Sequence, residues 1–429
     1  MNLLTFLGTA KYQQTTYTLN AQRYTTCYCP AAVAHFCRPE STLVVVTKGA
    51  QDMHFEALAD EISGFTRPIA VPIPDGHSEA DLWRIFDALT RQVSQGDELV
   101  VDITNGFRSL PFLSFLAVAF LRIARQVKVN HIYYGAWEAR NQETNESPIF
   151  NLTPFVTLLD WLIATNRFTR FGDASDLAGL LTNDIPPGYV LATDLEARKL
   201  RDGLKNAAGV MESVSLALRL ARPLETMAAS QALVGTLGQV GPLVGQKARP
   251  FSLLTEQVSQ TYQPLALSEA EKTGNWPQNL LIQFDLIYWY LSKGQIVQAI
   301  TLAREWLVSL LVYHFQAGAL TDYGGARRPI EIALGNAAER QKKAPGPVLE
   351  TPYDKPLQDL PSYDEIGQMW GTLTQLRNDT AHVGMRPNPG SARSLRDRAC
   401  DLYSSLWQIG AFFLPLAELT GEKKEPCKP

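Results

Sequence analysis

The stretch ELVVDITNGFRSLP, residues 98–111, passes from an apolar run directly into a glycine turn that carries polar side chains. The run LVV is rich in β-branched residues, which is typical of a buried strand. Asp102, Thr104, Asn105 and Arg108 follow where this strand is expected to end. Polar chemistry at the end of a buried strand predicts a binding site at one edge of a sheet.

The sequence around this stretch alternates short apolar runs with helical periodicity. Strands are predicted at 3–8, 42–49, 68–73, 98–106 and 129–135. A helix is predicted over 78–95, with Ser78 as its N-cap. Nearly continuous apolar strands separated by helices are typical of parallel sheets covered on both faces. The predicted fold of this part is an α/β Rossmann-like domain with a mostly parallel sheet.

Strand signals nearly vanish after about residue 160, and the rest of the chain shows a period of 3.6 residues. We therefore expect an all-α C-terminal domain, and we place three parts at 1–165, 166–275 and 276–429. The middle part is a helical connecting region that resembles nothing we can name. The stretch 345–361 holds five prolines and is predicted to be an exposed loop without helix.

The composition sets limits on function. The chain has 45% hydrophobic and 19% charged residues, and 39 basic against 43 acidic residues give a net charge of -4. No overall field attracts nucleic acid or a membrane, so any contact with nucleic acid must be local. The start MNLLTFLG is typical of a strand and not of a signal peptide. The apolar run SLPFLSFLAVAFL is too short to span a bilayer, which predicts a cytoplasmic protein.

One cluster of possible metal ligands lies near the N-terminus. The segment CYCPAAVAHFC offers Cys27, Cys29, His35 and Cys37. Its spacings match no common zinc module, and residues two apart on a helix point to different sides. We expect no metal site, and interpret these thiols as small buried side chains.

Three predicted strand ends carry loops suited to a phosphorylated ligand. Glycine lets backbone N–H groups approach a phosphate, while hydroxyl, amide and cationic side chains bind it or a base. Glycine and threonine also build ordinary turns, so the pattern alone does not decide. The chain lacks a dinucleotide fingerprint and a phosphate-binding P-loop. The candidate residues are Gly8, Thr9, Thr47, Lys48, Thr104, Asn105, Gly106 and Arg108.

A second group of candidate residues lies in SYDEIGQMWGTLTQLRNDTAHVGMRP, residues 362–387. Ser362 with Glu365 forms a capping-box pattern, and Gly384 is a stop signal, so one helix of about six turns is predicted. Its apolar stripe is Ile366, Met369, Trp370, Leu373 and Leu376.

Arg377 continues this stripe by spacing, which would place a guanidinium on a buried face. Asn378 and His382 lie one turn apart on the same side. Such a trio often only caps a helix end. The same trio can cleave RNA without metal, because histidine moves protons and arginine stabilises the charged phosphorane.

Three segments resemble known families. The segments FLGTAKYQQTTY and DITNGFRSLP together resemble the signature of CARF-domain proteins of the type III CRISPR accessory family. The segment RNDTAH resembles the R-x4-H motif of HEPN ribonucleases. Their order and distance are similar to those of a CARF–HEPN ribonuclease, so the resemblance spans most of the chain.

The resemblance implies a fold, an activator and a reaction. A CARF-like sensor at 1–165 would bind cyclic oligoadenylate, with cyclic tetra-adenylate favoured, at the strand-end residues given above. A HEPN-like domain at 276–429 would cleave single-stranded RNA without metal at a site shared by a homodimer, through Arg377 and His382 with Asn378 in support. The family usually has a histidine where this chain has Asn105, so any role of that imidazole is open here.

Two other functions remain open. The helical half could be a non-catalytic dimerisation or effector-docking module beneath a CARF sensor. Alternatively, the CARF half could itself degrade cyclic oligoadenylate as a ring nuclease. RNA breakdown measured with and without the activator separates these alternatives.

Overall fold

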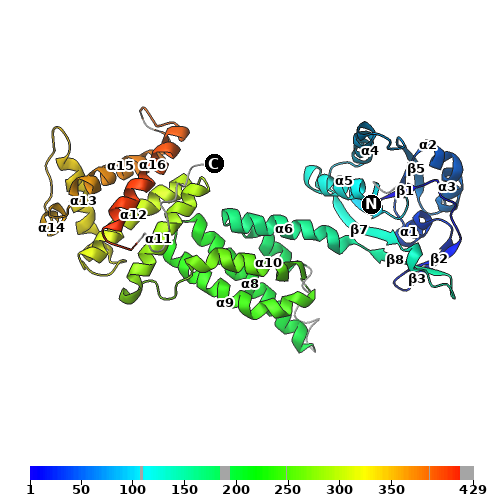
Figure 1. The fold of residues 1–429 in the computed structure, drawn as a ribbon, viewed down its shortest axis with the longest axis horizontal. Helices are drawn as coiled ribbons and strands as arrows, with labels where there is room; N and C mark the ends of the chain where they lie inside the picture. The colour runs from blue at the N-terminus through cyan, green and yellow to red at the C-terminus, as the bar shows by residue number, and fades with distance from the viewer. Residues whose placement is uncertain (107–109, 184–193, 248, 386, 416–429) are drawn as a thin grey trace. The chain divides into compact units, whose positions relative to one another are not determined.

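The computed structural model describes residues 1–106, 110–183, 194–247, 249–385 and 387–415. It divides into two compact units, Met1–Asp160 and Trp161–Pro429, and Figure 1 labels most of their elements. The first unit is an α/β fold around one sheet and the second is built from helices, as the sequence predicts. The predicted division of the helical part at residue 275 stays a prediction.

The first unit is built on an eight-stranded sheet with the order β3-β2-β8-β7-β6-β1-β4-β5. The strands are β1 (Asn2–Leu7), β2 (Thr15–Leu19), β3 (Gln22–Thr26), β4 (Ser41–Val46), β5 (Arg67–Pro72), β6 (Glu98–Asp102), β7 (Lys128–Gly135) and β8 (Glu146–Asn151). β5, β4, β1, β6 and β7 are all parallel. These five strands are the ones predicted from the sequence.

The other three strands were missed by the sequence prediction. β8 pairs antiparallel with β7, β2 pairs parallel with β8, and β3 pairs antiparallel with β2. β2 and β3 form a hairpin with a two-residue loop in which Asn20 has a φ of 54°. Asparagine tolerates this left-handed conformation, so the alternating TTYTL and the following Asn could have indicated a hairpin.

Helices cover both faces of the sheet. The helices are α1 (Cys29–Cys37), α2 (Lys48–Ala50), η1 (Gln51–Phe55), α3 (Glu56–Ile62), α4 (Glu79–Arg91), α5 (Leu110–Ala124), η2 (Trp137–Ala139) and the first part of α6 (Thr153–Phe171). One buried cluster joins the sheet to α4 and α5, and another joins it to α1 and α3. Ser78 caps α4 as predicted, because its Oγ accepts a hydrogen bond from the backbone N–H of Asp81.

The strand order creates a topological switch point in this sheet. After β1 the chain forms β2 and β3 at the far edge of the sheet and then α1, which packs on one face, whereas β6 is followed by α5, which packs on the other face. The helices that follow the neighbouring strands β1 and β6 therefore lie on opposite faces of the sheet. In open α/β sheets such a topological switch point is where ligands bind.

The helical unit packs around one continuous buried cluster, which includes residues from Trp161 to Leu414. Its elements are the end of α6, α7 (Ser175–Thr182), α8 (Leu195–Arg219), α9 (Pro223–Lys247), α10 (Arg249–Tyr262), η3 (Gln263–Leu265), η4 (Thr273–Asn275), α11 (Trp276–Ser292), α12 (Ile296–His314), η5 (Tyr323–Arg327), α13 (Arg328–Arg340), α14 (Asp354–Gln358), α15 (Tyr363–Ala381) and α16 (Ala392–Ala411).

The proline-rich stretch 345–361 is not wholly a loop, so this prediction was wrong in part. It contains α14, a single turn of helix with Pro356 inside it. Proline is tolerated there because the first amides of a helix have no partner within the helix.

Helix α12 passes a test of length and apolar composition for a membrane span. Within the helical unit, however, 61% of its apolar window is buried. It was the one such helix found among the residues that the structure describes. A buried core helix of this composition needs no lipid.

Candidate functional site

The loops predicted to bind a ligand meet at the switch point. β4, β1 and β6 are neighbouring parallel strands, so their carboxyl ends lie at the same edge of the sheet. A methyl group added to Gly8 would lie 3.7 Å from the backbone N of Gly106. A methyl group added to Gly49 would lie 3.4 Å from Thr9 Cγ2. The structure therefore brings the three loops into contact.

A fully buried carboxylate holds this edge together. Asp102, the last residue of β6, accepts a hydrogen bond from Thr5 Oγ1 on β1 at 2.6 Å. It also accepts one from the backbone N–H of Thr104 at 3.0 Å and another from the Thr104 hydroxyl. Burial raises the pKa of Asp102, while these hydrogen bonds lower it by a smaller amount.

The Thr104 hydroxyl therefore already has hydrogen-bond partners within the protein. It accepts a hydrogen bond from the backbone N–H of Gly135 on β7 at 2.7 Å, and it contacts Cys29 Sγ at 3.3 Å. A hydroxyl has one proton and two lone pairs, so little capacity remains for a ligand. Thr104 positions the loop after β6, and the prediction that its side chain contacts a ligand gains no support from this geometry.

Asn105 and Gly106 behave differently from their neighbour. The Asn105 Nδ2 atom is buried and has no hydrogen-bond partner among the residues that the structure describes. Gly106 is exposed and has a φ of +129°, which side chains rarely adopt. A methyl group there would also lie 2.8 Å from Leu110 Cδ1. Asn105 thus offers an unused donor beside a backbone turn that requires glycine.

Thr47 and Lys48 begin the helical segment that follows β4. Thr47 is buried, and its hydroxyl accepts a hydrogen bond from the backbone N–H of Ala50 at 3.3 Å. Lys48 is exposed, and its ammonium pairs with Asp52 one turn later at 2.7 Å. Exposed pairs of this kind contribute little stability, so Lys48 can turn to an anion at little cost.

Three aromatic rings near these loops were missed by the sequence prediction. The rings of Tyr12 and His54 lie 4.7 Å apart, and those of Tyr12 and Tyr28 lie 5.4 Å apart. The Tyr12 hydroxyl accepts a hydrogen bond from the Gly8 N–H at 2.8 Å, and burial raises its pKa to about 12. These rings come from three separate segments, so no local pattern in the sequence brings them together.

The remaining candidate ligand and metal residues of the α/β unit say less about a binding site. Thr9 is exposed. Arg108 lies outside the described residues. Cys27, Cys29 and Cys37 are free thiols, and His35 stacks on Tyr24 with ring centroids 4.3 Å apart. The described part of the chain holds no group of three or more His, Cys, Asp or Glu placed to bind a metal ion.

The second candidate site lies at the end of α15. The helix runs from Tyr363 to Ala381, and Gly384, with a φ of +73°, follows its end as predicted. The predicted capping box is wrong, because the Ser362 side chain caps no N–H of α15. Ser362 has φ and ψ of -98° and 23°, and an N-cap hydroxyl usually reaches the helix from an extended backbone.

Arg377 is exposed, which corrects the prediction that it lies on a buried face. The apolar stripe up to Leu376 is buried, but toward the end of the helix Asp379 is the buried residue instead. Asp379 accepts a hydrogen bond from the backbone N–H of Gly390 at 3.0 Å. The buried face of α15 therefore turns away from Arg377 in the last turn.

The candidate catalytic side chains have few contacts with the protein. The Arg377 guanidinium donates a hydrogen bond to Asn378 Oδ1 at 3.2 Å and has no other described partner. His382 is exposed, and its imidazole makes no hydrogen bond or ion pair within the described ranges. Five residues correspond to about 140° around a helix, so Arg377 and His382 of one chain point in different directions.

Comparisons with known proteins give one relevant match. No protein-family profile matches the chain. The chain is 31% identical over 112 residues to a protein of Methanocaldococcus jannaschii described as CRISPR-associated. The match covers 25% of this chain and 18% of that protein, so the chain spans about a fifth of the length of this relative.

The Asp102 network leads to a prediction about stability. We expect Asp102→Ala to lower the free energy of unfolding by about 2–4 kcal/mol, because it leaves two hydroxyls and one N–H without their acceptor. Thr5→Val removes one of these hydrogen bonds and should cost only about 1 kcal/mol. Amide hydrogen exchange of β1 and β6 in the full chain measures both values. Equal effects of the two substitutions would contradict this account.

The raised pKa of Asp102 gives the sign of the pH dependence. Its contribution to stability should be complete below the ordinary aspartate pKa of about 4 and should decline as the pH rises through its raised pKa. Asp102→Asn should remove this decline. The same slope of stability against pH in both proteins would show that Asp102 is not its source.

Proposed function

We propose that the chain is a CRISPR-associated endoribonuclease that binds cyclic oligoadenylate in its α/β unit and cleaves single-stranded RNA with its helical unit. Its similarity to a CRISPR-associated protein supports a CRISPR-related role. Because the chain covers only 18% of that relative, the specific activity rests on the sequence motifs and the geometry described above.

One observation carries the catalytic proposal. If Arg377, Asn378 and His382 served only to fasten the helix end, their side chains would contact the segments that follow α15. Instead Arg377 and His382 are exposed, and the residue that holds the helix end to Gly390 is Asp379. Exposed side chains of these types that make no contact with the following segment are available to a substrate.

The proposed reaction follows from the chemistry of these groups. His382 can accept the proton of a ribose 2′-hydroxyl or give a proton to the leaving 5′-oxygen. Arg377 can stabilise the added negative charge on the phosphorane. In-line attack by the 2′-oxygen forms a 2′,3′-cyclic phosphate and releases a 5′-hydroxyl, and the proposed mechanism uses no metal cofactor.

The activator site is proposed at the switch point of the sheet. The loops after β1, β4 and β6 offer backbone N–H groups, the unused Asn105 amide and the exposed Lys48 ammonium. Tyr12, Tyr28 and His54 offer aromatic rings of the kind on which bases stack. Adenylate phosphates and bases match this combination of groups.

We further propose that the active protein is a homodimer. Arg377 and His382 of one chain diverge, so a site that uses both is most simply formed by two copies of α15. Helix α5 supports a dimer in the α/β unit, because it is apolar on its outer side as well as its buried side. Its exposed apolar residues are Phe112 (65% exposed), Leu116 (42%), Phe120 (51%) and Ile123 (74%). Such a stripe on a protein surface often marks an interface.

The first test concerns catalysis. Single-stranded RNA should be cleaved when a cyclic oligoadenylate is added, and His382→Ala should slow cleavage about a hundredfold or more. The exposed His77→Ala is the matched control and should cleave normally. Gel analysis of the products in EDTA should show the same cleavage as without it. A folded His382→Ala protein with normal activity would refute the catalytic assignment.

The second test concerns the activator site. Lys48→Glu should raise the activator concentration for half-maximal cleavage roughly tenfold, because a reversed charge repels phosphate. The maximal rate should change little. Lys355→Glu is the matched control, since Lys355 forms a similar exposed pair with Asp359 at 2.7 Å. If calorimetry shows that both variants bind cyclic tetra-adenylate like the wild type, the ligand lies elsewhere.

The third test concerns the dimer. Phe120→Asp should shift the protein to monomers in light scattering and reduce RNA cleavage, because it places a charge in an apolar interface. Leu253→Asp, at an exposed apolar residue of α10, should remain dimeric. A wild-type protein that cleaves RNA as a monomer would exclude the shared site.

A further inference from the structure

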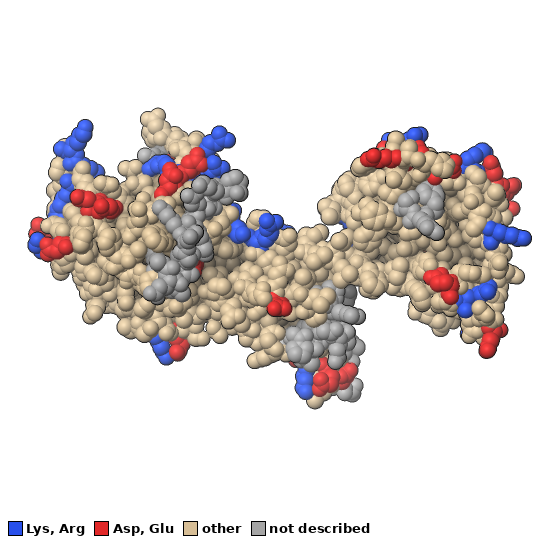
Figure 2. Space-filling view, in the orientation of Figure 1, with Lys and Arg blue, Asp and Glu red and all other residues tan. Residues whose placement is uncertain are grey.

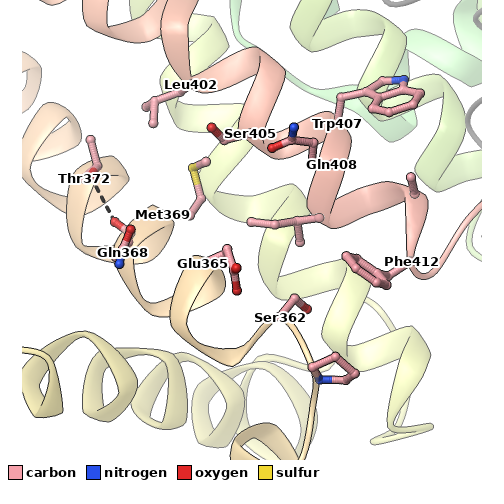
Figure 3. Close-up of a pocket in the computed structure, with 13 residues that line it drawn as sticks. Ser362, Glu365, Gln368, Met369, Thr372, Leu402, Ser405, Trp407, Gln408 and Phe412 are labelled. Carbon is pink, nitrogen blue, oxygen red and sulfur yellow. Dashed lines mark hydrogen bonds between the residues drawn. The ribbon is translucent and has the colours of Figure 1, made fainter.

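A pocket of about 600 Å³ lies between α15 and α16 in the helical unit (Figure 3). Glu365 and Met369 extend from α15 toward this space, and Ser405 and Gln408 extend toward it from α16. Its volume is in the range of sites that hold small molecules or single nucleotides.

The lining of this pocket suits a flat, neutral and polar group. Met369 is buried at the pocket, and Phe412, at its edge, is 66% exposed. The side chains of Gln368 and Gln408 offer amides, which both donate and accept hydrogen bonds. Among the lining residues the one charged side chain is Glu365, which disfavours a phosphate. A nucleobase has an apolar face and a polar edge that match these groups.

One row of α15 includes both a pocket residue and the candidate catalytic histidine. Gln368, Gln375 and His382 recur every seven residues, so each lies about 20° around the helix from the one before it. Gln368 lines the pocket. From Gln375 to His382 the distance along the helix axis is about 10 Å, and from Gln368 it is about 21 Å.

Arg398 lies beside Gln375, the middle residue of this row. Arg398 of α16 donates a hydrogen bond to Gln375 Oε1 at 3.5 Å, and it has no carboxylate partner in the described part of the chain. Arg396, by contrast, pairs with its neighbour Asp397 at 2.7 Å. On the face shown in Figure 2, charged side chains stand in small separate groups, so a single available arginine can matter for an anionic substrate.

We propose that the surface along α15 and α16, from the pocket to His382, is the substrate groove of the ribonuclease, in which Arg398 binds an RNA phosphate and the pocket reads an unpaired base. This inference rests on the proposed function and extends it to sequence preference. The scissile phosphate would lie at His382, a neighbouring phosphate at Arg398, and a base beyond it between Gln368 and Gln408. The pocket residues are therefore specificity-determining and Arg398 is a binding residue.

The test uses the full chain with its activator and a set of short RNAs that differ in one base near the cleavage site. The wild type should prefer one base by about tenfold to a hundredfold in kcat/KM. Gln408→Leu should abolish most of this preference. Arg398→Ala should raise KM for all RNAs alike and reduce the salt dependence of binding by about one counterion, and Arg398→Lys should restore part of the affinity.

Two controls separate the possible outcomes. Arg396→Ala on α16 and Gln257→Leu on α10 should leave KM and base preference unchanged. If the wild type cleaves RNA but Gln408→Leu keeps its base ranking, or if the pocket variants change only the oligomeric state, the groove proposal is wrong and the ribonuclease proposal stands.

If the wild type cleaves no RNA, binding decides between the two proposals. Anisotropy of a labelled 2′-deoxy-substituted RNA then measures binding by the same variants. Weaker binding by Arg398→Ala and Gln408→Leu would support the groove although the proposed chemistry fails. Unchanged binding would overturn the groove proposal as well.

Discussion

A fully buried carboxylate needs hydrogen-bond donors around it. Asp102 is such a carboxylate, and it lies at the carboxyl ends of the central strands of the sheet. Its donors come from Thr5 on β1 and from Thr104 on the loop after β6. Thr104 in turn accepts a hydrogen bond from Gly135 on β7. Three parallel strands are therefore fastened to one another where the loops begin, which gives the loops a rigid base.

Hydrogen bonding to Asp102 distinguishes Thr104 from Asn105, two adjacent residues that were both predicted to contact the ligand. Thr104 is occupied by the network, whereas the Asn105 amide nitrogen is buried without a described partner. A buried donor without a partner costs stability, so natural proteins keep one mainly where a ligand or water completes it. At the end of α15 the side chains of Asp379 and His382 differ in a similar way, because the Asp379 carboxylate accepts a hydrogen bond from Gly390 while the His382 imidazole has no described partner.

The sequence predicts those features that depend on neighbours along the chain. The five parallel strands contain short apolar runs, and Ser78 and Gly384 act on their own helix ends. The hairpin β2–β3 escaped prediction because its strands are rich in threonine and lack such a run. The exposure of Arg377 depends on where neighbouring elements stop covering α15, and the contact of Tyr12 with His54 depends on the tertiary fold. Neither can be obtained from periodicity.

Helix α6 bears on how this protein can be divided into fragments. It is one helix, Thr153–Phe171, although the compact units separate after Asp160. A fragment that ended at residue 160 would lose the backbone hydrogen bonds that cross this point and keep about two turns, too short for a stable helix. Val156, which is buried against the sheet, lies on those two turns. A fragment of the α/β unit should therefore extend to Phe171, so that it keeps the whole of α6.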